Sequence, residues 1–325
     1  MALDVKDRKI LYALDRDARQ PLAALGKAAG LSKQAVFHRL SRLEKTAIQK
    51  YLAIVDLAKL GYTGYKVFLR LQDADPKTER KLLDYLIRHS RVQWLAGTDG
   101  AFDVVFNFFA RSPEDAFTQL QALDRAFGKY IAERHIVVLL NAQFYTRAYL
   151  LSASSSELFT PAFFGAHASP ARLDAADLAI LGALCHDARM PYVAVAKKAG
   201  VSADAVRLRI RKMEKTGVLQ HCALVLDNAF LGQQHYKVLL RLHPLDEPRA
   251  QELDAFLRAQ PNIYFSSRAL GPFDAEFNVE VPDAPAFRRI LMDFKNRFSG
   301  IIKDYSVLTI YQVFKFDFYP MRSGT

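Results

Sequence analysis

The chain has 325 residues, of which 51% are apolar and 24% charged, a composition typical of a globular protein with more than one core. It contains no uncharged apolar run of the roughly 18 residues needed to cross a bilayer, and residues 1–8 lack the apolar core of an export signal. Its two cysteines, Cys185 and Cys222, form no C-x-x-C pair, which excludes a disulfide framework and a four-ligand zinc site. These features predict a cytoplasmic protein without membrane segments.

The positive charge is concentrated in two stretches of the chain. Of the formal net charge of +11, residues 1–50 carry +6 and residues 171–220 carry +4, which leaves +1 for the remainder. A surplus confined to two segments indicates a polyanionic partner, and double-stranded DNA is the partner we expect. The alternative is a surface that is merely basic and solvated, but such a surface would spread the surplus more evenly.

The same two stretches open two copies of one sequence unit. The pattern D-x-x-D-x-x-I-L begins at Asp4 and at Asp174, and D-A-R-x-P begins at Asp17 and at Asp187, an offset of 170 in each case. Further along, the offset becomes 171 for two more matches, Tyr65–Leu71 with Tyr236–Leu242 and the pattern G-x-F-D at 100–103 with 271–274. A nearly constant offset indicates a tandem duplication.

The first fifty residues of each copy have the pattern of three short helices. Apolar residues recur at helical spacing in the first segment, and Pro21 is well placed to open the second. Gly30 suits the positive φ of a helix end, and the Ser32 hydroxyl can cap the helix that follows. We predict helices over 5–14, 22–29 and 33–46, with the same arrangement in the second copy.

Such a unit is a helix-turn-helix, whose third helix fits the major groove of DNA. Two units with basic outer faces favour DNA over a plain packing module or a protein-docking domain. Lys33 and Gln34 are placed for base contacts, whereas Arg39 and Arg42 are placed for phosphate contacts. The residues predicted to contact DNA are Ser32, Lys33, Gln34, His38, Arg39 and Arg42 in the first copy, and Ser202, Arg207, Arg209, Arg211 and Lys212 in the second.

The two copies differ at the positions that face the groove. Lys33-Gln34 becomes Ala203-Asp204, and His38 becomes Leu208. An acidic side chain there repels phosphate, although it can accept a hydrogen bond from a cytosine amino group. We expect the second copy to recognise a different half-site or to contribute mainly backbone contacts.

A longer segment with alternating strand and helix patterns follows each helix-turn-helix. In the first copy we predict strands over 62–71, 91–98, 102–110 and 131–141, and helices over 76–89 and 113–127. The order βαββαβ is the ferredoxin-like plan, with both helices on one face of an antiparallel sheet. The apolar runs Val104–Phe106 and Val137–Leu140 do not alternate, so we expect the second sheet face to be buried by the other copy.

The predicted fold class is therefore α+β, with two repeats. Each is a winged or three-helix helix-turn-helix domain, at 1–55 and 171–226, followed by a ferredoxin-like sensor domain, at 60–145 and 231–320. A linker at 146–170 joins them, and Phe159, Phe163 and Phe164 indicate that part of it packs.

These motifs together resemble the Lrp/AsnC (feast/famine) family of prokaryotic regulators. The opening D-x-x-D-x-x-I-L, the R-x-x-R-L-E pattern of Arg39–Glu44 with a looser counterpart at Arg209–Glu214, and G-x-F-D carry the resemblance over nearly the whole of both copies. It implies a transcriptional regulator whose paired sensor domains bind a small molecule, often an amino acid, near the G-x-F-D loop. Carried to this sequence, it implicates Thr98, Asp99, Gly100, Asp103, Arg268, Gly271 and Asp274.

The resemblance leaves two points open. Gly100 and Gly271 also suit a tight hairpin that needs positive φ, and Asp103 and Asp274 also suit binding of turn amides, so a purely structural role competes with effector binding. Family members are usually single units that dimerise and often build octamers. A fused pair contains its dimer within one chain, which leaves further homo-oligomer assembly open.

An enzyme is the strongest rival to a regulator. Siroheme decarboxylases resemble the same family and also occur as fused pairs, but they carry a His- and Arg-containing segment where this chain has Ala101–Asp103 and Pro272–Asp274, which contain no histidine. We therefore expect no enzyme activity, no catalytic residues, no cofactor and no metal site. A third alternative is a small-molecule sensor that has lost DNA binding, which Asp204 favours for the second copy.

Overall fold

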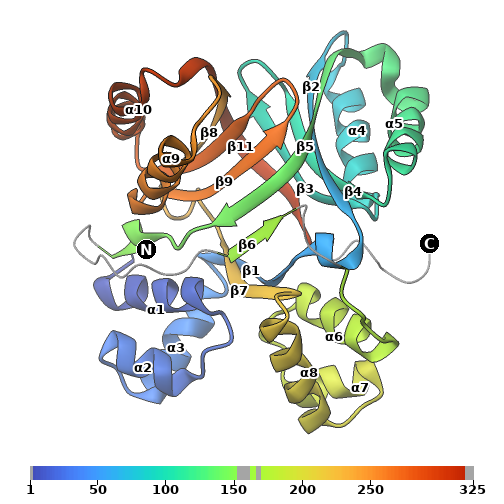
Figure 1. Ribbon diagram of the computed structural model, residues 1–325. Coiled ribbons are helices and arrows are strands. Elements are labelled where there is room, and N and C mark those ends of the chain that lie inside the picture. The colour runs from blue at the N-terminus through green and yellow to red at the C-terminus, as the bar shows by residue number, and fades with distance from the viewer. Residues whose placement is uncertain (1–2, 152–161, 166–169, 319–325) are drawn as a thin grey trace.

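The computed structural model describes residues 3–151, 162–165 and 170–318. Part of the predicted linker, including Phe159, therefore lies outside the described residues. Residues 1–2 of the predicted domain 1–55 and residues 319–320 of the predicted domain 231–320 also lie outside them. The described part consists of two helix-turn-helix domains at one end and a large sheet flanked by helices at the other (Figure 1). No helix in these residues is long and apolar enough to cross a membrane.

Each helix-turn-helix domain forms as its sequence predicts. The Asp4 carboxylate accepts a hydrogen bond from the Asp7 N–H, and the Asp7 carboxylate accepts one from the Asp4 N–H, a reciprocal cap that starts the first helix. Gly30 ends the second helix at a φ of 62°, and the Ser32 hydroxyl accepts from the Ala35 N–H. The helices are α1 (Val5–Arg16), α2 (Leu22–Ala29) and α3 (Lys33–Leu43), repeated as α6 (Ala175–His186), α7 (Tyr192–Ala199) and α8 (Ala203–Lys215).

A two-stranded ribbon that the sequence patterns did not predict joins the two domains. Strands β1 (Ile48–Val55) and β7 (Leu219–Leu226) pair antiparallel, and Leu52 lies opposite Ala223, its counterpart 171 positions later. The ribbon is exchanged between the copies, because α1 packs on β7 and α6 packs on β1. Each helix-turn-helix core therefore depends on a strand from the other copy.

The sensor domains have the predicted βαββαβ order. In the first copy the elements are β2 (Thr63–Leu71), α4 (Pro76–Arg88), β3 (Val92–Asp99), β4 (Val104–Ala110), α5 (Pro113–Phe127) and β5 (Ile131–Phe144). In the second they are β8 (Gln234–Leu242), α9 (Glu247–Ala259), β9 (Ile263–Leu270), β10 (Ala275–Val281), α10 (Ala284–Phe298) and β11 (Ile302–Phe316). Short 3-10 helices at Leu57–Leu60, Gly128–Tyr130 and Ala148–Leu150 connect these elements.

The two sheets merge into one closed barrel. The strand order is β2-β4-β3-β11-β8-β10-β9-β5, and β5 pairs back with β2. The long strands β5 and β11 bridge the copies, since β5 also pairs with β9 and β11 with β3. Phe68, Trp94, Leu239 and Leu308 pack together inside, so the other copy buries the second sheet face, as predicted. Strand β6 (Ala162–Gly165), which contains Phe163 and Phe164, adds to the free edge of β5.

Candidate nucleic-acid interface and ligand cavities

The two recognition helices, α3 and α8, each present exposed polar side chains. In the first copy the exposed residues include the cap Ser32 together with Lys33, Gln34 and His38, as predicted from the sequence. In the second copy Ser202, Arg207, Arg211 and Lys212 are exposed. Two large apolar side chains accompany them, Phe37 at 55% and Leu208 at 65% exposure, a pattern that suits contact with a partner surface.

Arg39, Arg42 and Arg209 are 29%, 38% and 30% exposed, and they form ion pairs within their own domains that the sequence did not predict. Arg39 Nη1 lies 2.7 Å from Asp4 Oδ2 and 2.8 Å from Asp7 Oδ1, and Arg42 Nη2 lies 2.5 Å from Asp7 Oδ2. Arg209 repeats the arrangement with Asp174 at 2.8 Å and Asp177 at 2.7 Å. The D-x-x-D pattern thus holds α3 and α8 by ion pairs, because the caps of α1 and α6 lie beside them.

These ion pairs have an electrostatic signature at the helix cap. The Asp7 backbone N–H, together with the Arg39 guanidinium, holds the pKa of the Asp4 carboxyl below its ordinary value. Asp7 itself is 1% exposed, so its negative charge depends on these cations and N–H donors rather than on water. The arginines therefore stabilise the domain before any contribution to binding.

Asp204 has a partner within its own helix. Its carboxylate lies 3.8 Å from Arg207 Nη2, and both side chains are more than half exposed. An exposed pair of this kind contributes little to stability, so the pairing with Asp204 holds Arg207 only weakly. The second recognition helix consequently keeps a basic surface in spite of its acidic residue.

The repeated D-A-R-x-P motif forms a reciprocal clasp between the two helix-turn-helix domains. Arg19 donates to the carbonyl of Ala188, and Arg189 Nη1 donates to the carbonyl of Ala18 at 2.5 Å. Each guanidinium also stacks on an aromatic ring of the other copy, Arg19 at 4.6 Å from the Tyr192 centroid and Arg189 at 5.3 Å from that of Tyr51. The clasp and the exchanged ribbon fix the two recognition helices relative to one another.

The predicted effector residues of the G-x-F-D loops have structural roles. Gly100 (φ 131°) and Gly271 (φ 150°) have positive φ, and a β carbon there would lie 3.0 Å from Val307 O and 2.9 Å from Ile136 O of the other copy. The Asp103 and Asp274 carboxylates accept from the N–H groups of Leu71 and Leu242, at 2.6 and 2.7 Å. Buried Thr98 donates to the Phe102 carbonyl, whereas Asp99 is exposed.

Arg268 does not join this group. Its Nη2 lies 3.0 Å from Asp254 Oδ1 and 3.3 Å from the Ala250 carbonyl, both on α9. The grouping of Arg268 with Gly271 and Asp274 is therefore wrong, because β9 turns the arginine toward the helix layer.

A polar cavity of about 480 Å³ adjoins the second loop, and we call it the loop-271 cavity. Gly271 and Asp274 line it with His135, Arg241 and Lys303. The His135 ring stacks on Phe273 at 5.9 Å, and its Nε2 lies 2.5 Å from Glu133 Oε1. The loop sequences contain no histidine, but the pairing of β5 with β9 brings one beside them. Sequence spacing gives no sign of this neighbour.

Two lysines lie inside the barrel, at positions that none of the predicted sites includes. Lys66 and Lys237 occupy equivalent positions, 171 apart, and each is 1% exposed. Lys66 donates to Glu276, and Lys237 donates to Glu276 Oε1 at 2.9 Å and to Asn278 Oδ1 at 2.9 Å. We call Lys66, Lys237 and Glu276 the interior lysine cluster. The sequence signal that could have marked this cluster is a lysine repeated at equivalent positions of two largely apolar strands.

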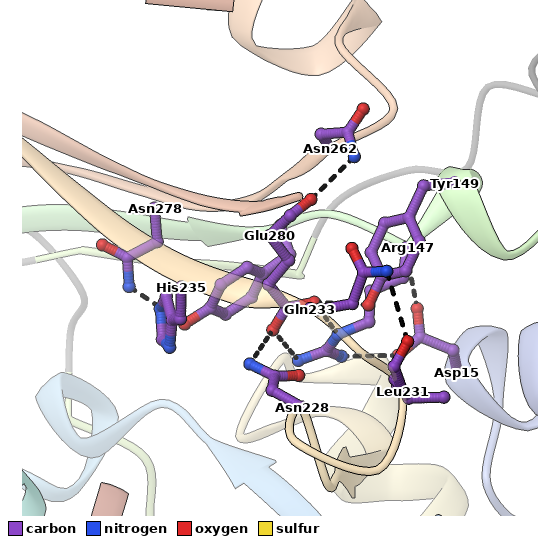
Figure 2. A network of polar contacts seen from close by, with 11 residues as sticks. Asp15, Arg147, Tyr149, Asn228, Leu231, Gln233, His235, Asn262, Asn278 and Glu280 are labelled. Carbon is purple, nitrogen blue, oxygen red and sulfur yellow. Dashed lines mark hydrogen bonds and ion pairs between the residues drawn. The ribbon is translucent and has the colours of Figure 1, made fainter. Parts of the chain in front are cut away.

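A second buried group connects the barrel to the first helix-turn-helix domain (Figure 2). Arg147 lies between two carboxylates, with Nη1 2.9 Å from Asp15 Oδ1 on α1 and Nε 2.8 Å from Glu280 Oε2 on β10. Glu280 also accepts from Tyr149 Oη at 2.7 Å and Asn228 Nδ2 at 3.1 Å. We call these five residues the Arg147 network. Arg147 lies beyond the repeated sequence patterns, in the predicted linker. Comparison of the two copies therefore could not identify the Arg147 network.

The described residues contain no group of three or more His, Cys, Asp or Glu side chains that could hold a metal ion. The candidate functional features in the described residues are the two recognition helices, the loop-271 cavity and the two buried polar groups.

This architecture defines a tandem helix-turn-helix protein whose two copies share one barrel. The sequence pattern of the AsnC-type helix-turn-helix domain matches residues 3–44 and 173–214. The chain is 32% identical over 120 residues to the proline dehydrogenase transcriptional activator of Rhodobacter capsulatus, covering 37% of this chain and 78% of that protein. It is 26% identical over 141 residues to the HTH-type transcriptional regulator FL11 of Pyrococcus abyssi, covering 43% and 91%. The chain belongs to the Lrp/AsnC family.

Similarity over the full length is found with a solved enzyme. The crystal structure of the siroheme decarboxylase NirDL matches with a TM-score of 0.60, covering 96% of this chain and 93% of that chain at 13% identity. A second structure of that enzyme, in co-complex with an iron-uroporphyrin III analogue, has the same TM-score and covers 97% and 95%. At this identity the likeness establishes a common two-copy fold.

Proposed function

We propose that the protein is a DNA-binding transcriptional regulator in which both helix-turn-helix domains engage one duplex. The observation that carries the proposal is the reciprocal clasp of Arg19 and Arg189, which holds two recognition helices with exposed cations in a fixed relation. A protein that binds paired half-sites needs its two recognition helices at a fixed distance and orientation, because the centres of the half-sites lie about one helical turn of DNA, or a multiple of it, apart.

The two half-sites are expected to differ. Lys33 suits a guanine edge and Gln34 an adenine edge in the first half-site, whereas Asp204 in the second suits a base amino group such as that of cytosine. Arg211 and Lys212 supply phosphate contacts there. The target is therefore an imperfect palindrome.

Salt-dependent binding tests this interface. Replacing Arg211 and Lys212 together with alanine should weaken binding to all sequences and lower the slope of log K against log salt by about 1 for each phosphate that is no longer neutralised. Lys33→Ala should instead relax preference at one base pair, by roughly 1–3 kcal/mol. Fluorescence anisotropy with selected duplexes measures both effects.

Replacing Lys77 and Lys81 together with alanine is the matched control, called here the Lys77 variant, since it removes two exposed cations from α4. An Arg211/Lys212 variant that binds DNA like the Lys77 variant would remove α8 from the interface. Absence of binding to the upstream DNA of its own gene and to random pools, even at low salt, would discard the regulator proposal.

We also propose that a small molecule in the loop-271 cavity regulates binding. Its size falls in the range of ligand sites, and His135, Arg241 and Lys303 suit a carboxylate ligand such as an amino acid. The Arg147 network provides a mechanical connection from the barrel to α1. Anisotropy titrations with single amino acids test this: a shift in DNA affinity that is lost in Arg241→Ala supports it, and equal shifts in both proteins oppose it.

A tetrapyrrole enzyme is the second candidate. The common fold with NirDL and the presence of His135, Arg241 and Lys303 in the lining of one cavity favour it, because a porphyrin with several carboxylates needs such cations. We place it second because the loops themselves lack a histidine. Titration with iron-uroporphyrin III distinguishes the two candidates. For a regulator we expect no saturable change in the Soret band of the porphyrin. A saturable change that is abolished by His135→Ala would favour the enzyme.

A further inference from the structure

The interior lysine cluster is unbalanced in charge. Two ammonium groups share one carboxylate, because the position equivalent to Glu276 in the first copy, 171 residues earlier, is Val105. Glu280, the next buried carboxylate on β10, is engaged by Arg147, Tyr149 and Asn228 instead. A buried charge without a partner is strongly disfavoured, so this arrangement calls for one further negative charge.

Hydrogen-bonding capacity is also unfilled on the side of the cluster that faces a cavity. An ammonium group carries three donors, yet among the described residues Glu276 is the one hydrogen-bond acceptor of Lys66. Asn107, at 8% exposure, has an Oδ1 with no partner in the described part of the chain, and this acceptor needs a donor, such as a water molecule beside the lysines. Both side chains line the same internal cavity, together with Lys237 and Asn278.

The cavity limits the size of any occupant. Its volume is about 30 Å³, room for one or two waters, and Glu276 is not part of its lining. Its walls are aromatic, since the Trp94 ring lies 5.1 Å from Lys237 Nζ and the Phe265 ring 5.2 Å from Lys66 Nζ. Burial lowers the pKa of Lys66 to about 7 against the opposing pull of Glu276, as expected where a counter-charge is missing.

We propose that Lys66 and Lys237 bind a small monovalent anion in the interior of the barrel, either a halide or the carboxylate group of a short organic acid. The anion accepts hydrogen bonds from the two ammonium groups on the side opposite Glu276, and it neutralises the cluster. The site is separate from the loop-271 cavity, with which it shares no lining residue. It does not depend on whether the protein binds DNA.

The single tryptophan of the chain reports on this site. Trp94 lines the cavity and is 7% exposed, so iodide in bulk solvent should quench it only weakly and linearly. Titration of the full chain with potassium iodide, at ionic strength held constant with potassium sulfate, is expected to give saturable quenching instead. Competition with chloride and formate, which are both small enough for the cavity, then identifies the source: displacement by chloride alone indicates a halide, and tighter displacement by formate indicates a carboxylate.

Two variants with opposite expected effects make the test specific. Lys66→Met leaves one balanced pair, Lys237 with Glu276, and should weaken iodide binding by about tenfold or more. Glu276→Gln removes the competing carboxylate and should strengthen iodide binding by a similar factor. Should Lys66→Met fail to fold, the Glu276→Gln variant and an anomalous bromide peak between the two Nζ atoms in crystals still decide. Linear quenching in the native chain, or equal saturation constants in all three proteins, would overturn the proposal.

Discussion

Arg147→Met is expected to lower the free energy of unfolding by about 3–5 kcal/mol, the range seen when one partner of a buried ion pair is removed. The side chains of Arg147, Asp15 and Glu280 are 11%, 3% and 2% exposed, so the variant leaves two carboxylates without access to water. Urea unfolding at pH 7 measures the loss. Combining Arg147→Met with Asp15→Asn and Glu280→Gln should recover much of the stability, because the triple variant buries no unpaired charge.

The pH dependence of this variant has a defined sign. Burial alone would raise the pKa of Glu280, but Arg147 outweighs it, and the native pKa is lowered. Glu280 thus stabilises the native protein above its unfolded pKa of about 4.3, and this contribution is lost as pH falls through the native pKa. In the variant the unpaired carboxyl has a raised pKa, so its cost grows as pH rises above about 4.3. The difference between native and variant should shrink as pH falls from 7 to 4, and a constant difference would point to poorer packing instead.

Asp7→Ala is expected to destabilise the first helix-turn-helix domain by about 2–4 kcal/mol, because it removes the reciprocal half of the capping box and the hydrogen bonds to two charged groups. The Asp7 carboxylate accepts from the Asp4 N–H and pairs with both Arg39 and Arg42, so one substitution removes the ion pairs that join α3 to the start of α1. Hydrogen exchange should show the amides of α1–α3 exposed earlier, while those of the barrel keep their protection.

Asp177→Ala in the second copy is the matched comparison. Asp177 has the same cap and the Arg209 pair, but lysine replaces arginine at position 212, so its removal should cost less. An equal loss of stability in Asp7→Ala and Asp177→Ala would show that the ion pair of Arg42 with Asp7 does not stabilise the domain. A loss of DNA affinity in Arg39→Ala without any loss of stability would restore the phosphate contact predicted from the sequence.

The elements of each copy could be predicted because each carries a local signal. Pro21, Gly30 and Ser32 mark helix ends, and the repeat doubles every observation. The ribbon of β1 and β7 was missed because its pairing partner lies in the other copy, far along the chain. The closure of the barrel by β5 and β11 was missed for the same reason. The apolar runs in β4 and β5, which do not alternate with polar residues, did correctly predict that the second face of the sheet is buried.

The candidate sites were less predictable than the fold. Spacing on a helix indicated that Arg39 lies outside the domain core, but not that Asp4 and Asp7 reach its guanidinium. Position in a motif grouped Arg268 with the second loop, whereas the direction of its side chain depends on β9 and α9. The contacts of long side chains follow from tertiary packing, which one-dimensional patterns do not contain.

The interior lysine cluster contains three charged side chains, because Glu276 faces two lysines without a second glutamate. In a pair of identical subunits every residue at the shared axis occurs twice, so charges there come in even numbers. Covalent fusion removes that restriction, since one copy carries valine at position 105 where the other carries glutamate at 276. The centre of this protein therefore holds an odd number of charges, a composition that no symmetric homodimer can adopt. A ligand bound at the centre therefore has Glu276 on one side and Val105 at the equivalent position on the other, so the two sides of its site differ in charge.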